Sequence, residues 1–198
     1  MIKNIYAPFA LVVAFSFGGS SCTSCINGQK NSIVTIEYVT SGALEEEKKV
    51  FIRAFQAAYE GIPLAVLNVE SIEAFLEAAF EDEPLDLNNP NKNVSCAVAK
   101  KGEAIVGVIF FEPGLQENEV YIRQLAVEPA EQKQGIGQQL MMSIQTALPK
   151  TERLVVATRA VNVPARNFYK KIGFTECKEV PHGLNPERYV GYEKDLAQ

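Results

Sequence analysis

A glycine-bearing turn, Gln132-Lys133-Gln134-Gly135-Ile136-Gly137, is the stretch of this sequence best suited to hold a ligand. It lies between an apolar run, 125–127, and an amphipathic run, 137–148, so we expect a strand to lead through the turn into a helix. The first backbone N–H groups of a helix have no partner within it, and the helix dipole adds partial positive charge there. Glycine also lets the backbone approach a ligand closely. The turn is therefore predicted to bind a phosphate group.

This turn is neither of the two common phosphate-binding loops. The sequence does not match the Gly-x-Gly-x-x-Gly motif, because Leu140 stands where the third glycine would be. It also lacks the Gly-Lys-Ser/Thr motif. Glycines also close many strand-to-helix turns that bind nothing. The elements on either side must therefore decide between the two interpretations.

The composition is that of one ordinary globular domain. The chain has 198 residues, of which 47% are hydrophobic and 22% charged, with a net charge of −5. The lysines are dispersed, so no basic stripe is available for nucleic acid, and a nucleic-acid partner is not expected. We expect no metal site, because Cys22 and Cys25 have no second pair of ligands nearby.

The first residues differ from the rest of the chain. Lys3 precedes an almost wholly apolar stretch, 6–17, and small residues follow before Cys22. This resembles a bacterial export signal, and the small residue ahead of Cys22 is also similar to a lipoprotein signal, although Gly19 departs from that pattern. The alternative is an uncleaved apolar tail or a start codon placed too early.

The predicted organisation is a signal peptide or membrane anchor over 1–21, a linker over 22–31 and a domain over 32–198. The protein would be exported or membrane-anchored if 1–21 is a signal, and cytoplasmic otherwise. Cys22 and Cys25 favour a disulfide or a lipid over redox catalysis.

Hydrophobic periodicity predicts a mixed α/β fold in the order β-α-α-β-β-β-α-β-α-β-β. Short connections favour an antiparallel meander in its middle, and a helical crossover makes the strand at 153–158 parallel to that at 119–127. Strands are expected at 33–39, 94–99, 104–111, 119–127, 153–158, 174–177 and 188–193, and helices at 44–59, after Asn68, after Gly135 and from about Pro164 to Gly173.

At this point the chain resembles the GNAT acetyltransferase superfamily over about 32–198. One motif is Leu125-Ala126-Val127-Glu128-Pro129 leading into the turn, which matches the family's Gln/Arg-x-x-Gly-x-Gly/Ala acyl-CoA loop. The other, at 162–174, matches its Asn…Tyr…Gly-Phe helix through Asn162, Tyr169, Gly173 and Phe174. The resemblance implies an N-acetyltransferase that moves an acetyl group from acetyl-CoA to an amine, with no metal.

The resemblance also implies how the co-substrate is bound. The pantetheine arm would pair with backbone groups on one of two splayed parallel strands, and Asn162 would hold its amides. The residues expected to bind acetyl-CoA are Leu125, Ala126, Val127, Gln132, Gln134, Gly135, Ile136, Gly137, Gln138 and Asn162.

The catalytic groups follow from the same resemblance. The backbone N–H of Ala126 would stabilise the oxyanion, and Tyr169 would protonate the leaving thiolate. Some family members use a strand glutamate as base, but Tyr121 stands at that position. Glu119, on the same face, is the candidate base, with a water-mediated base or another strand as alternatives. His182 lies in a loop that can border the acceptor pocket.

Two classes of function stay open at this stage. The first is the N-acetyltransferase, whose acceptor would be a small amine, an amino acid, a peptide N-terminus or a lysine side chain. The second is a non-catalytic acyl-CoA-binding or interaction protein, favoured by the missing strand carboxylate and the export-like segment. A secreted disulfide-bearing binding domain has only Cys22 and Cys25 in its support. Pairing of the last strands between subunits would allow a homodimer, and the first segment would allow membrane attachment.

Overall fold

The computed structural model describes residues 33–39, 45–67, 69–72 and 94–196. The export-like segment, Cys22 and Cys25 lie outside these residues, as does the expected helix after Asn68 apart from its start at Ile72. Among the residues described, no helix combines the length and the apolar character needed to cross a bilayer.

The elements lie close to where the periodicity predicts them. The structure has β1 (Val34–Val39), α1 (Glu45–Tyr59), α2 (Leu64–Leu67), β2 (Ser95–Lys101), β3 (Ala104–Pro113), β4 (Glu119–Val127), η1 (Pro129–Glu131), α4 (Ile136–Ala147), β5 (Arg153–Arg159), α5 (Val163–Lys171), β6 (Thr175–Glu176), η2 (Pro181–Gly183) and β7 (Tyr189–Asp195). The four-residue α2 was not expected, because one turn is too short for a helical period to be recognised. It follows Pro63, a residue that suits a helix start.

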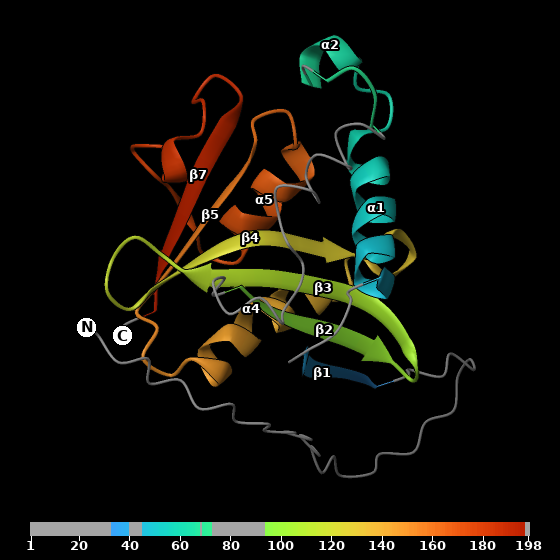
Figure 1. Cartoon of the computed structure of the whole chain (residues 1–198), viewed down its shortest axis with the longest axis vertical. Helices are drawn as coiled ribbons and strands as arrows, with labels where there is room; N and C mark the ends of the chain where they lie inside the picture. Colours follow the sequence, from blue (N-terminus) through green and yellow to red (C-terminus); the bar gives the residue numbers. More distant parts are fainter. Residues whose placement is uncertain (1–32, 40–44, 68, 73–93, 197–198) are drawn as a thin grey trace.

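The strands form one mixed sheet in the order β1-β2-β3-β4-β5-β7-β6. Within this sheet the β4–β5 pair is parallel and the other pairs are antiparallel. The α/β fold class and the parallel relation of β4 and β5 are thereby confirmed. Figure 1 shows α1 crossing one side of the sheet, while α4 lies on the other side.

Each face of the sheet is buried by its own helices, because side chains alternate along a strand. Val50 and Ala54 of α1 pack with Val108 and Ala126 on one face. The cluster on the opposite face joins α4 and α5 to the strands through side chains that include Ile109, Ile122, Ile136, Leu140, Ile144, Tyr169 and Tyr192. Both faces are thus covered by apolar packing.

Gly107 of β3 lets α4 lie close to the sheet. A Cβ at this position would be 3.0 Å from Leu140 Cδ1 and 3.1 Å from Ile136 Cγ2. Both side chains are almost completely buried. The start of α4, which carries the glycine-bearing turn, is therefore fixed against the central strands.

A β-bulge divides β4 into two parts. Phe110 pairs with Gln124 and Phe111 with Ile122, which leaves Arg123 as an extra residue. Its guanidinium donates to both oxygens of Glu112, at 2.9 and 2.8 Å. Because the extra residue reverses the alternation, Ile122 and then Leu125 face the α4 side, while Ala126 faces α1.

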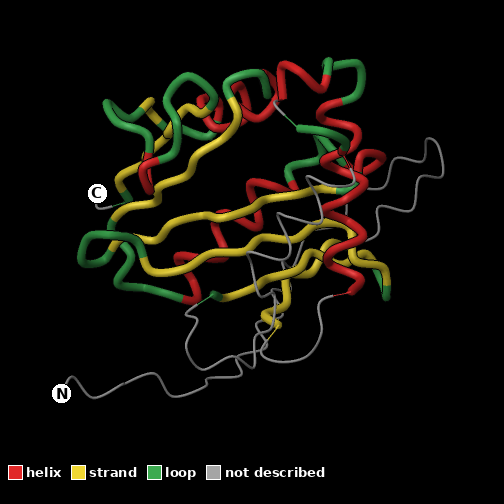
Figure 2. The backbone as a smooth tube through the Cα atoms, turned by 45° about the horizontal axis from the view of Figure 1, so that its top comes forward, coloured by secondary structure: helices red, strands yellow, loops and turns green. Residues whose placement is uncertain are grey.

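The bulge coincides with the point where β4 and β5 separate. Their register runs from Glu119↔Arg153 to Ile122↔Val156 and stops there, although both strands continue. Figure 1 shows β5 rising away from β4, and the backbone trace of Figure 2 shows the same divergence. The splayed central strands expected from the sequence are present.

We predict that Leu140→Ala destabilises the protein by about 2–5 kcal/mol, because the removed side chain would leave a cavity between α4 and β3. Met142 lies on the same helix and is 64% exposed, whereas Leu140 is 0% exposed. Chemical denaturation of Leu140→Ala and of the control Met142→Ala measures the difference. Equal unfolding midpoints for both variants would contradict this account of the core.

Candidate active site

The turn before α4 presents backbone amides at the mouth of the gap between β4 and β5. Lys133 and Gly135 both have positive φ, 63° and 82°, and Gly135 is the N-cap of the helix. The N–H of Gln139 donates to Gly135 O at 3.0 Å, which is the first hydrogen bond of the helical pattern. The amides of Ile136, Gly137 and Gln138 precede it and have no acceptor within the helix. This end of α4 is suited to an anion.

Side chains from neighbouring elements hold this turn in place. Lys101, at the end of β2, forms an ion pair with Glu131 and donates to Gln134 Oε1 at 3.0 Å. Gln134 Nε2 in turn donates to Glu131 at 2.9 Å, and Gln132 Nε2 donates to Val127 O at 3.2 Å. The Lys101 ammonium holds the pKa of Glu131 below its ordinary value. Both glutamines are thus part of the turn's own hydrogen bonding, and their role as phosphate donors stays a prediction.

Gly137 brings α4 and α5 together. A Cβ here would lie 3.2 Å from Phe168 Cζ and 3.7 Å from a methyl of Val127. The glycine is therefore needed for the close approach of the Phe168 ring. Tyr169 follows Phe168 in α5, so this contact also helps to fix the position of Tyr169 relative to the amides of the turn.

The pairing of β3 with β4 decides which backbone groups face the gap. The N–H of Glu128 donates to Val106 O at 2.9 Å, and the register continues as Val127↔Gly107 and Ala126↔Val108. Because hydrogen-bonded and non-bonded positions alternate in an antiparallel pair, the amide of Ala126 points towards β3. The amides of Leu125 and Val127 point the other way, into the gap. The Ala126 amide therefore does not face the gap, contrary to its expected role as oxyanion donor, whereas the amides of Leu125 and Val127 do.

Tyr169 is buried where α5 meets the sheet. Its ring lies 5.6 Å from that of Phe174 and 5.7 Å from that of Tyr192, and 6% of its surface is exposed. Burial raises the pKa of the Tyr169 phenol, and the nearby Tyr121 and Tyr59 raise it further. These two tyrosines belong to β4 and α1, so the hydroxyl of Tyr169 lies among groups from three elements. The phenol keeps its proton at neutral pH and is able to donate it.

Asn162 is the N-cap of α5. Its Oδ1 accepts from the Ala165 N–H at 3.1 Å, and its Nδ2 donates to Tyr59 Oη at 3.3 Å. The side chain thus ties α5 to the end of α1. Its expected contact with the pantetheine arm is a separate matter and stays a prediction.

Glu119 lies at the end of β4 that is far from the gap. Leu115 N–H donates to its Oε1 at 3.0 Å, and its Oε2 is 3.6 Å from Arg153 Nε. A Cβ on Gly114 would collide with this side chain. Glu119 and Leu125 are six strand residues apart, which is roughly 20 Å along the strand. These contacts give the carboxylate a role in closing the β3–β4 turn.

The structure adds a contact that the sequence could not reveal. The ring centroids of Tyr121 and His182 are 3.9 Å apart, although the two residues are 61 positions apart in the chain. Tyr121 is 9% exposed, whereas His182 is open to solvent. The loop histidine therefore lies on the residue that occupies the expected position of the family's carboxylate.

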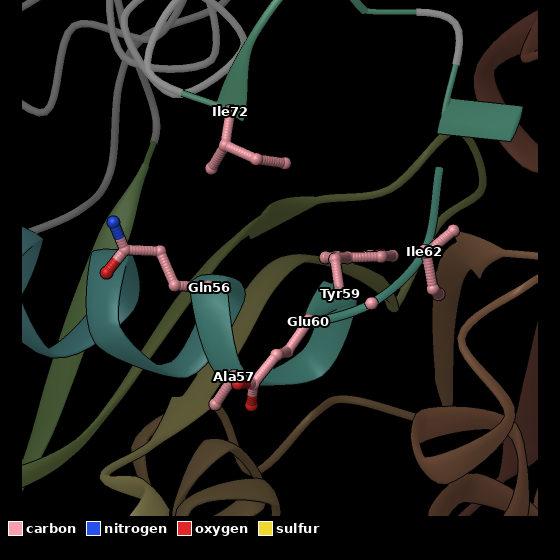
Figure 3. A pocket seen from close by; sticks show the side chains of 7 residues that line it. Gln56, Ala57, Tyr59, Glu60, Ile62 and Ile72 are labelled. Carbon is pink, nitrogen blue, oxygen red and sulfur yellow. The ribbon is translucent and has the colours of Figure 1, made fainter. Parts of the chain in front are cut away.

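A pocket of about 530 Å³ opens at the end of α1. Figure 3 shows Gln56, Ala57, Tyr59 and Glu60 along the helix end, with Ile62 beyond them and Ile72 apart. Tyr59 links this pocket to Asn162 and so to α5. The hollow at this end of α1 is partly polar and is bordered by the Glu60 carboxylate.

Comparison with known proteins gives the class to which this chain belongs. The model of the acetyltransferase (GNAT) family matches residues 64–174. The chain belongs to this family. No curated protein matches the sequence.

Solved structures share the fold at low sequence identity. The PaiA N-acetyltransferase of Thermoplasma acidophilum, solved in complex with coenzyme A, is 20% identical with a TM-score of 0.64, covering 81% of this chain and 99% of its own. A GNAT-family acetyltransferase of Staphylococcus aureus is 18% identical with a TM-score of 0.56, covering 82% and 99%. The ribosomal-protein-S18-alanine N-acetyltransferase of Escherichia coli is 16% identical with a TM-score of 0.52, covering 84% and 96%.

We predict that Gly135→Ala weakens coenzyme A binding by on the order of tenfold, because an altered turn would misplace one or two amides whose hydrogen bonds are worth about 1 kcal/mol each. An alanine at φ 82° also strains the backbone by about 1–2 kcal/mol. Gly61→Ala carries a similar strain, at φ 75°, at the other side of the site. Calorimetry should show weaker binding for Gly135→Ala alone, whereas thermal melting should show a loss in both. An unchanged dissociation constant for Gly135→Ala would remove the turn from the binding site.

Proposed function

We propose that this protein is an N-acetyltransferase that moves the acetyl group of acetyl-CoA to an amine. The observation that carries the proposal is the end of β4–β5 pairing at Ile122↔Val156, beside the open amides of α4. A gap of this kind between two strands offers unpaired backbone groups to an extended, amide-containing chain, and the helix end offers donors to a diphosphate. That the related Thermoplasma enzyme was solved with coenzyme A supports this choice of ligand.

In this proposal the turn holds the pyrophosphate through the amides of Gln134, Gly135, Ile136, Gly137 and Gln138. The pantetheine arm runs along β4 and pairs with Leu125 and Val127, whose backbone groups point into the gap. The thioester then lies near Tyr169. Gln132 acts by orienting the carbonyl of Val127, since its side chain donates to that oxygen.

The chemistry is direct transfer. The amine nitrogen attacks the thioester carbon, and the oxyanion that forms accepts a hydrogen bond from the amide of Leu125 or Val127. The C–S bond then breaks, and the thiolate takes a proton from the Tyr169 phenol. Because burial keeps that phenol protonated, the proton is available throughout the neutral pH range.

The acceptor in this proposal enters from the side of α1, where the pocket at Tyr59 and Glu60 is open. A carboxylate at this entrance favours a small or peptide amine, which carries positive charge in water. We assign the acetyltransferase domain to residues 32–198, because β1 pairs with β2 within the same sheet.

The proposal is tested with the full-length protein, acetyl-CoA and a broad panel of amines. We expect Tyr169→Phe to lower kcat by on the order of 100-fold with little change in coenzyme A binding, because only the proton donor is lost. Tyr192→Phe is the matched control, since it removes the hydroxyl of the buried ring stacked on Tyr169.

Three results have separate meanings in this assay. No coenzyme A release and no binding would refute the proposal. Binding without turnover, unaffected by Tyr169→Phe, would favour a non-catalytic acyl-CoA-binding protein. Equal losses in Tyr169→Phe and Tyr192→Phe would assign Tyr169 to packing alone.

We also propose that residues 1–21 are an export signal or membrane anchor, on the evidence of their apolar run and the following Cys22. Intact-mass analysis of the protein from its native cell should show loss of this segment, or a lipid on Cys22. An intact, unmodified chain in the soluble fraction would refute the export signal and leave acetyl-CoA within reach of the enzyme.

A further inference from the structure

We propose that His182 is the base that takes the proton from the acceptor amine, an inference that rests on the proposed acetyl transfer. Its support is the position of the ring rather than any sequence motif. His182 lies on Tyr121 with ring centroids 3.9 Å apart. Tyr121 pairs with Val155, one step before the last β4–β5 pair, so the imidazole lies next to the point where the gap begins.

The loop that carries His182 is seated firmly on the sheet. A Cβ on Gly191 of β7 would collide with the Pro181 ring and would lie 3.2 Å from Cys177 Cβ. The absence of a side chain at Gly191 therefore allows this loop to pack closely against β7. Pro181, the residue before His182, is therefore packed against β7, while the imidazole itself is open to solvent.

The backbone of His182 is also unusual. Its φ is 56°, in the left-handed region that non-glycine residues seldom adopt. The following Gly183 has φ 67°, so the turn places two left-handed residues in succession. Such conformations are found most often where the position of a side chain matters for function. Here the conformation directs the ring towards Tyr121.

The charge relations connect His182 with the proposed proton donor. Tyr121 interacts with both, because its ring contacts the imidazole and it also raises the pKa of the Tyr169 phenol. Burial raises the pKa values of Tyr59 and Tyr169, so both phenols stay protonated and cannot serve as bases near neutral pH. An imidazole is the side chain that exchanges a proton most readily in that range.

Glu119 does not compete for this role in the present arrangement. Its carboxylate is bound by the Leu115 N–H and lies beside Arg153, at the closed end of the β4–β5 pair. His182 lies nearer the open part of the gap, since it rests on Tyr121 two residues further along β4. The base thus comes from the β6–β7 loop and not from the central strand.

The step balances as follows. The neutral ring nitrogen of His182 takes one proton from the alkylammonium ion, which becomes a neutral amine with a free lone pair. The amine forms the C–N bond, the C–S bond breaks, and Tyr169 donates its proton to the thiolate. The amide nitrogen then loses its extra proton, which restores the Tyr169 phenol, and His182 returns its own proton to solvent.

The test compares two acceptors that differ in basicity. We would use an alkyl amine that the full-length wild type acetylates, and the corresponding alkoxyamine, which is already neutral at pH 7.5. His182→Asn is the main variant, because asparagine tolerates positive φ. His182→Gly is a second variant, which fits the same backbone without strain. Glu187→Gln, an exposed change in the same loop, is the control.

We expect kcat/KM for the alkyl amine to fall on the order of 100-fold in both His182 variants, and to recover partly when imidazole is added to His182→Gly. The alkoxyamine should lose less than about threefold, because it needs no base. Coenzyme A binding should stay unchanged in calorimetry. Equal losses for both acceptors, or no loss for either, would overturn the assignment of His182 as base. A wild type that acetylates no amine would overturn the proposed function itself, which is a different result.

Discussion

The structure depends on one interruption of backbone pairing. β4 bonds to β5 only as far as Ile122, and the extra residue Arg123 marks the change. A bulge bends its strand and increases the local twist, so β4 continues along β3 while β5 turns away with β7. Backbone groups that a continuous sheet would satisfy are thereby directed into a gap. Every element of the proposed site is placed relative to that gap.

The elements around the gap between β4 and β5 are packed firmly against one another. α4 is fixed to the sheet where Gly107 admits Leu140, and α5 is fixed to α4 where Gly137 admits Phe168. The turn between β4 and α4 is held by the ion pair of Lys101 and Glu131. Amides that point at a ligand stabilise it most when they need not reorganise to do so. Gly107 thus allows α4 to lie close to the sheet, and Gly137 allows α5 to lie close to α4.

The polar side of the site is built from aromatic residues rather than carboxylates. Tyr59, Tyr121 and Tyr169 come from α1, β4 and α5, and His182 joins them from the β6–β7 loop. Burial favours the neutral forms of the phenols Tyr59 and Tyr169, which suits donation of a proton and not its removal. With a tyrosine at the strand position, the proposed reaction needs a base from another element, and the His182 imidazole in the β6–β7 loop is the group that contacts Tyr121.

The order of the strands, the parallel β4–β5 pair and the turn before α4 could be predicted from the sequence, because they follow from local periodicity, glycine positions and the handedness of the crossover. The sequence did not show which residues of the site face the gap or contact one another. The amides of Leu125 and Val127, rather than that of Ala126, face the gap because a hydrogen bond from Glu128 to Val106 sets the phase of pairing. The contact of Tyr121 with His182 likewise joins residues 61 positions apart. These points could be read only from the folded molecule, since the register of distant strands and the position of a loop depend on packing that local sequence does not encode.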